Sequence, residues 1–185
     1  MRRAEVTRET KETRITVELN LDGSGQAEVE LDEPFFRHML ITLAKFSEID
    51  VKMTAKGDLP HHTIEDIGIT LGYAIDKALE RESIKRYGYA VIPMDDALVL
   101  CSVDLVRRPY FSYNLNLQSN AEFEPFLVEH FFRSLAYSIP MTLHLYQLNG
   151  RDPHHIAEAA FKSFGLSLKQ AAEVSQNSMS VKGSL

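Results

Sequence analysis

The stretch PHHTIE at residues 60–65 recurs as PHHIAE at residues 153–158, and this repeat decides the fold. A second pair of matches, EPF at residues 33–35 and at residues 124–126, precedes the two copies in the same order. Self-similarity of this kind indicates duplicated supersecondary units that pack on one another. The alternative is coincidence between short motifs, because the repeat rests on few identities.

The hydrophobic periodicity around the two copies supports a duplication, because helices and strands follow the same order in both halves. We therefore expect α+β layers made of two halves, residues 1–92 and 93–185, in one compact unit whose polar C-terminal tail is flexible. The expected helices are 34–46, 61–79, 125–137 and 153–174; the expected strands are a hairpin of 12–21 with 26–31, then 49–55, 97–106, 110–117 and 141–147.

Composition limits the classes of function. A chain of 185 residues with 44% apolar residues is long enough for one real core. A formal net charge of -6 argues against nucleic-acid binding, which needs a basic surface, but leaves small phosphorylated ligands open. The charged segment Met1–Arg14 is unlike a signal peptide, and no apolar run reaches the roughly 18 residues of a membrane span, so we expect a cytoplasmic protein. Cys101 lies in an apolar run and is expected to pack in the core.

The repeated motif places two imidazoles and one carboxylate at the start of each helix. Glu65 follows His61 by four residues and His62 by three, so it lies on the same face as either histidine, whereas the two histidines diverge from each other by about 100°. Adjacent histidines can therefore serve two different metals. Nitrogen and carboxylate ligands suit Mn, Fe, Ni or Zn, and the lack of thiolates disfavours structural zinc.

The alternative interpretation of this motif is structural. In that case the residues are ordinary helix N-termini, with Asp152 as a cap and the histidines hydrated. Two copies that hold four of the seven histidines favour metal binding. Of the other histidines, His38 and His144, each considered alone, would be interpreted as structural residues of the core or its boundary. His130 has no motif around it and is also interpreted as structural.

Taken in order along the chain, these residues resemble the imidazoleglycerol-phosphate dehydratase family over nearly the whole length. The matching stretches are Arg8 to Thr13, His38-Met39-Leu40, Gly57-Asp58-Leu59, the first His-His copy with Asp66, Arg86-Tyr87-Gly88, Pro93-Met94-Asp95, Arg108-Pro109, Thr142-Leu143-His144, Gly150-Arg151, the second copy with Phe161-Lys162, and Lys182-Gly183. The resemblance implies a duplicated fold whose helices are sandwiched between two sheets.

The resemblance also implies a reaction, the dehydration of D-erythro-imidazole-glycerol phosphate to imidazole-acetol phosphate in histidine biosynthesis. It implies two Mn ions per active site, shared between subunits of a large homo-oligomer built from trimers, a 24-mer. The implied metal ligands are His38, His61, His62, Glu65, His144, His154, His155 and Glu158. The implied catalytic carboxylates are Glu12, Glu65 and Glu158, and the implied phosphate ligands are Arg86, Arg108, Lys162 and Lys182. The alternative for Glu12 is a place on a solvated strand edge without a catalytic role. The alternative for each of the four basic residues is that it is an ordinary surface cation.

Several positions depart from the family pattern. Arg37, Phe46, Asp96 and the pair Val106-Arg107 replace residues common in the family, and the loop before His61 is shortened. We expect the carboxylates that orient metal-bound imidazoles to be missing as a result. A divergent working dehydratase and a paralogue with another substrate both fit this pattern. A metal-stabilised assembly protein and a di-metal hydrolase are the remaining hypotheses.

Overall fold

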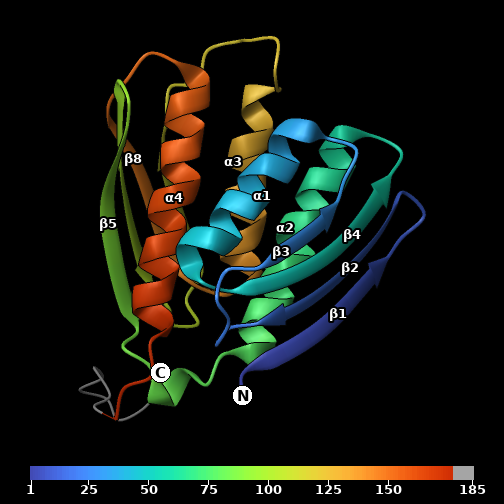
Figure 1. The fold of residues 1–185 in the computed structure, drawn as a ribbon, viewed down its shortest axis with the longest axis vertical. Helices are drawn as coiled ribbons and strands as arrows, with labels where there is room; N and C mark the ends of the chain where they lie inside the picture. Colours follow the sequence, from blue (N-terminus) through green and yellow to red (C-terminus); the bar gives the residue numbers. More distant parts are fainter. Residues whose placement is uncertain (177–185) are drawn as a thin grey trace.

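The computed structural model describes residues 1–176, in which two four-stranded sheets enclose a layer of helices (Figure 1). The elements are β1 (Arg3–Glu9), β2 (Thr13–Asn20), β3 (Ala27–Glu30), α1 (Pro34–Ser47), β4 (Asp50–Gly57), α2 (Pro60–Ala78), the 3-10 helix η1 (Arg81–Ser83), β5 (Tyr87–Met94), β6 (Ala97–Asp104), β7 (Tyr110–Asn114), α3 (Pro125–Ser138), β8 (Thr142–Asn149) and α4 (Pro153–Ala172). No helix in this part of the chain is long and apolar enough to cross a membrane.

The two sheets have the same topology. Their strand orders are β1-β2-β4-β3 and β5-β6-β8-β7, and in each sheet only the last pair is parallel, joined through α1 or α3. The predicted duplicated α+β fold, with its helices between two sheets, is therefore confirmed. The expected division after residue 92 falls inside β5, since this strand begins at Tyr87.

The predicted N-terminal hairpin is wrong. β2 does not pair with β3, because both edges of β2 are occupied by β1 and β4, and β3 pairs in parallel on the far side of β4. Strands β1 and β5 were not predicted, and β7 ends at Asn114 rather than at residue 117. Local alternation indicates that a segment is a strand but does not encode its partner, which explains the error.

Each of the four α-helices begins with a proline at its first turn. Proline is suited to this position because its fixed φ is helical and its missing N–H would have no partner there. The consequence is that His61 and His62, like His154 and His155, occupy the first turn, next to the sheet turns that lead into the helices. The same end of the helix layer therefore carries all four histidines (Figure 1).

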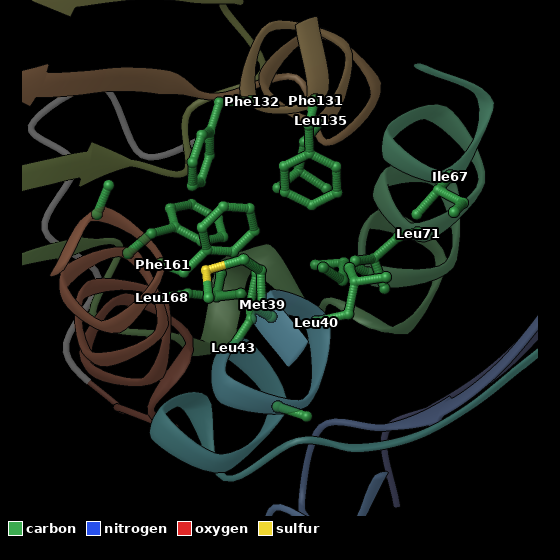
Figure 2. Packing of buried hydrophobic residues seen from close by; sticks show 14 of the residues in the cluster. Met39, Leu40, Leu43, Ile67, Leu71, Phe131, Phe132, Leu135, Phe161 and Leu168 are labelled. Carbon is green, nitrogen blue, oxygen red and sulfur yellow. The ribbon is translucent and has the colours of Figure 1, made fainter. Parts of the chain in front are cut away.

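The helices of both halves share one core. Phe131, Phe132 and Phe161 are fully buried and pack against Met39 and Leu43 of α1 (Figure 2). Burial of each such side chain stabilises the fold by about 2 to 3 kcal/mol. Cys101 also lies in this core, as predicted, and its burial raises the pKa of the thiol to about 12.

Helices α2 and α3 approach closely because α2 presents glycine to α3. A Cβ on Gly72 would lie 2.5 Å from the Cβ of Ser138, and one on Gly68 would lie 2.8 Å from the carbonyl oxygen of Phe131. No larger residue fits without separating the helices. This close packing brings the start of α2 next to His130 on α3.

Candidate metal and catalytic site

The first group of candidate ligands joins α1 to the start of α4. The Nε2 atoms of His38 and His154 lie 3.7 and 3.2 Å from Oε2 of Glu158. Helical spacing places His154 and Glu158 on one face, and the packing of α1 on α4 adds His38. All three ligand atoms lie within 4.8 Å of one another.

The second group joins the start of α2 to α3. Nε2 of His61 lies 3.4 Å from Oε2 of Glu65 and 3.1 Å from Nδ1 of His130. The His-His-x-x-Glu residues of the two groups correspond under the duplication, whereas His38 and His130 stand at different distances from the prolines that begin α1 and α3. The two groups also differ in exposure. The side chain of Glu158 is 11% exposed, whereas that of Glu65 is 43% exposed.

The interpretation of His130 as structural missed this contact. The repeat did not mark His130 as the counterpart of His38, because His38 follows Pro34 by four residues and His130 follows Pro125 by five. His144, which the resemblance named as a ligand, is in neither group of the described residues. It lies on the outer face of the second sheet, where its ring is 5.6 Å from that of Tyr110.

The second histidine of each pair points away from its group, as the helical geometry predicts. Nδ1 of His62 lies 2.8 Å from Oδ1 of Asp58 and 3.7 Å from Oε2 of Glu12. Nδ1 of His155 lies 2.8 Å from Oδ1 of Asp96. The hydrogen bonds with Asp58 and Asp96 raise the pKa values of the two imidazoles above their usual range. Each chain therefore presents two groups of three candidate ligands and two further imidazoles.

The expectation that carboxylates orienting the imidazoles would be missing is wrong for His62, His154 and His155. Asp58 and Asp96 have this role for His62 and His155, and Oε2 of Glu122 lies 2.6 Å from Nδ1 of His154. The pKa of Asp96 falls to about 2, first because of His155 and then because the backbone N–H groups of Arg151 and Asp152 donate to it. A carboxylate on Nδ1 leaves Nε2 as the ligand atom.

Lys162 contacts the first group rather than an open surface. Its Nζ lies 2.7 Å from Oε1 of Glu158, 3.3 Å from Sδ of Met94 and 5.5 Å from the centroid of the Phe46 ring. Burial, the largest single effect, raises the pKa of Glu158, but the contacts with Lys162, His38 and His154 together hold the pKa of this carboxyl below its usual value. Oε2 of Glu158 then faces the two histidines.

The other predicted phosphate ligands lie far from both groups. Arg86 binds both carboxylate oxygens of Asp104, at 2.6 and 2.9 Å, and its backbone N–H donates to the carbonyl of Ala171 at the end of α4. With a rise of 1.5 Å per residue, the 17 residues from His154 to Ala171 span about 25 Å. Arg108 lies beside Thr142, at the start of β8. Lys182 and the C-terminal tail lie outside the described residues.

Two of the departures have visible local consequences. Arg107 adopts a φ of 45°, a left-handed conformation that favours glycine. Arg37 donates to the carbonyl of Leu31, at 3.2 Å. Neither residue contacts the two groups directly.

The donor sets suit a transition-metal cation. Two ligands at about 2.1 Å from one ion are about 3 Å apart in octahedral geometry and about 3.4 Å apart in tetrahedral geometry. The four distances given above, from 3.1 to 3.7 Å, are close to these values, and the ligand atoms of each group all lie within 4.8 Å of one another. Histidine and carboxylate donors, with further carboxylates hydrogen-bonded to the imidazoles, form the usual environment of such an ion.

The duplicated fold defines an α+β protein with two groups of candidate metal ligands at helix N-termini. The family model described as imidazoleglycerol-phosphate dehydratase matches residues 32–168. The chain is 45% identical to the imidazoleglycerol-phosphate dehydratase of Lactococcus lactis subsp. cremoris (95% of this chain, 94% of that protein). It is also 45% identical to that of Lachnoclostridium phytofermentans (100% and 98%).

Solved structures agree with the sequence relatives. The crystal structure of the enzyme from Pyrococcus furiosus superposes with a TM-score of 0.90 at 41% identity, covering 97% of this chain and 100% of that one. The enzyme from Staphylococcus aureus gives a TM-score of 0.83 at 30% identity, with 94% and 99% coverage. The chain belongs to the imidazoleglycerol-phosphate dehydratase family. It is a hydro-lyase that dehydrates imidazoleglycerol phosphate in histidine biosynthesis.

Proposed function

We propose that this hydro-lyase works with two manganese ions per active site, and that His130 takes the place given to His144 among the ligands. The observation that carries the proposal is the pair of similar groups of three candidate ligands, each with an imidazole from a second helix. The proposed ligands are His38, His61, His62, Glu65, His130, His154, His155 and Glu158. Three ligands per group leave coordination positions open for a further imidazole and for substrate.

Completion of each group requires another copy of the chain. His62 and His155 diverge from the groups of their own chain, so they are suited to ligate metals held mainly by neighbours. This arrangement couples metal binding to assembly and supports a homo-oligomer built from trimers, for which we retain the 24-mer.

The outer faces of the two sheets support the same conclusion. The outer face of the first sheet is charged, with exposed Arg14, Glu18 and Lys52. On the second sheet Gly88 faces α4, so that Tyr87, Tyr89 and Val91 face outward, and they are 45, 70 and 46% exposed. An exposed aromatic face of this kind is typical of a surface that another subunit covers.

The substrate phosphate would also be bound by a neighbour. Substrate is only about 8 Å long from ring to phosphorus, since a few bonds of about 1.5 Å separate them. It cannot bridge the roughly 25 Å between His154 and Arg86 of one chain. Arg86 and Arg108 of one copy, with Lys182, are therefore proposed to hold the phosphate of substrate at metals of another, and Lys162 contacts it from the metal side.

The chemistry needs an electron sink and a proton carrier. Bound metal ions would supply Lewis acidity to the imidazole ring of substrate and orient it. Glu12 is 56% exposed and lies beside His62, so its carboxylate is free to move a proton between substrate and solvent. Glu65 and Glu158 fix charge at the two groups. The carboxylates that bind His62, His154 and His155 hold the rings in place.

A comparison of two histidine variants tests this assignment. Protein stripped of metal and reloaded with Mn should dehydrate imidazoleglycerol phosphate. His130→Ala should lose bound metal and turnover, whereas His144→Ala should retain both. The opposite result would restore His144 as the ligand. Iron, nickel and zinc, loaded in the same way, test the choice of metal.

We also propose a cytoplasmic location, consistent with the single buried thiol of Cys101.

A further inference from the structure

One buried carboxylate near the second group binds no histidine. Asp66 is 8% exposed and directly follows the candidate ligand Glu65 on α2. Its Oδ2 accepts a short hydrogen bond from the hydroxyl of Thr13, and its Oδ1 lies 2.9 Å from Nε of Arg8. Both donors come from strands β1 and β2, so Asp66 fastens the β1–β2 turn to the start of α2.

That turn carries Glu12. The hydroxyl of Thr10 lies 3.2 Å from that of Thr13 and accepts the backbone N–H groups of Glu12 and Thr13, at 3.1 and 3.0 Å. The carbonyl of Glu12 accepts the N–H of Asp58 at 3.1 Å. A continuous set of hydrogen bonds therefore runs from Asp66 through two hydroxyls to the backbone of Glu12.

The duplication provides an internal comparison. The residue that corresponds to Asp66 in the second half is Ala159, which cannot bind a turn in this way. The corresponding turn, between β5 and β6, is shorter and places Asp96 directly on His155. The buried carboxylate is thus present only in the half whose turn carries the exposed glutamate.

Burial of a carboxylate is costly unless specific donors compensate, and a purely structural link would be served by an apolar contact. A hydrogen-bonded link fixes direction as well as distance. Glu12 is otherwise exposed and would sample many positions. Fixing its backbone reduces that freedom, and misplacement of a catalytic group by about 1 Å can cost about 100-fold in rate.

We propose that Asp66 is a positioning residue that acts, through Thr13 and Thr10, on the placement of Glu12 during proton transfer. This inference rests on the proposed role of Glu12. In this proposal Asp66 contacts neither substrate nor metal. Thr13 provides the link between Asp66 and the turn that carries Glu12.

The test is a double-mutant cycle on the assembled, Mn-loaded enzyme. Thr13→Val keeps the shape of the side chain and removes its hydroxyl, and it should lower kcat about 10- to 100-fold with KM and bound metal unchanged. In the Glu12→Gln background the same change should alter kcat less than about 2-fold, because the group being positioned is gone. Asp66→Asn should behave like Thr13→Val, and Thr13→Ser should restore activity.

Thr16→Val is the matched control, since Thr16 lies on the same strand and its hydroxyl binds only that of Thr7 at the exposed face. It should leave kcat unchanged. An equal loss from Thr13→Val with and without Glu12→Gln would show a general structural effect and overturn the proposal alone. Full turnover by Glu12→Gln would overturn both this proposal and the role of Glu12.

Discussion

Two variants, each inactive alone, should regain activity when they are mixed and assembled together. Glu12→Gln removes the proposed proton carrier, and Arg108→Ala removes a proposed phosphate ligand. Arg108 lies at the start of β8, whose far end leads to α4 and His154. Glu12 lies at this same end of the helix layer, since its carbonyl accepts the N–H of Asp58 just before α2. Seven steps of about 3.3 Å make β8 about 23 Å long, so one substrate cannot bridge Arg108 and Glu12 of the same chain. The two functions of one site should therefore come from different chains.

The expected recovery follows from that separation. When the two variants are mixed in equal amounts, a site is intact if one of its chains carries Glu12 and the neighbour carries Arg108. Each condition holds for half of the chains, so about a quarter of the sites should be restored in a random assembly. If both residues of a site came from one chain, no mixed oligomer would contain an intact site.

The assay is steady-state turnover after removal of metal, mixing, and reassembly with Mn. A mixture of Glu12→Gln with Glu12→Ala is the matched control, because both variants lack the same group, and it should stay at the sum of its parents. Recovery no greater than this control, in oligomers shown by mass to be mixed, would refute the shared site.

The remaining predictions concern single chains. Asp96→Asn should weaken Mn binding about 10- to 100-fold in a metal titration, because His155 loses the acceptor that orients it, and unchanged affinity would contradict this role. Arg107→Gly should stabilise the metal-free chain by up to about 1 kcal/mol in urea unfolding, since it relieves a φ of 45°; a loss of stability would count against strain. Arg2 lowers the pKa of Asp22 in the folded protein. The ion pair therefore stabilises the fold above the pKa of Asp22 in the unfolded chain, near 3.8, and this stabilisation is lost as the pH falls through the lower pKa of the folded protein. Asp22→Asn should therefore flatten acid unfolding followed by circular dichroism between pH 5 and pH 2.5, by less than about 1 kcal/mol because Asp22 is half-exposed, and an unchanged profile would argue against the pair.

The sequence predicted the duplicated fold because the repeat marks equivalent helix starts, and proline defines those starts locally. It did not predict which strands pair. β2 and β3 alternate equally well, and only the position of β4 between them decides the order of the sheet. β1 and β5 were missed because charged or aromatic outward residues weaken the apolar signal of an edge strand.

The site was predicted only in part for a related reason. Spacing along one helix revealed His154 with Glu158, but contacts between helices depend on packing that no local pattern records. The close approach of α2 and α3 at Gly68 and Gly72 brings His130 to His61. The orienting role of Asp58 was open to prediction, since it precedes His62 by four residues on the entry to the helix.

Duplication alone would give two identical groups, and the differences between them therefore indicate separate roles. In the second half Lys162 binds Glu158 and that carboxylate is buried, whereas the corresponding position in the first half is Ile69, and Glu65 is open. A carboxylate held by an ammonium is fixed in place but has little freedom to exchange protons. The first half instead has an open group and a fastened turn that carries Glu12. With the proposed role of Glu12, the second half would hold charge in place and the first would move a proton, which is the division of labour that an elimination of water requires.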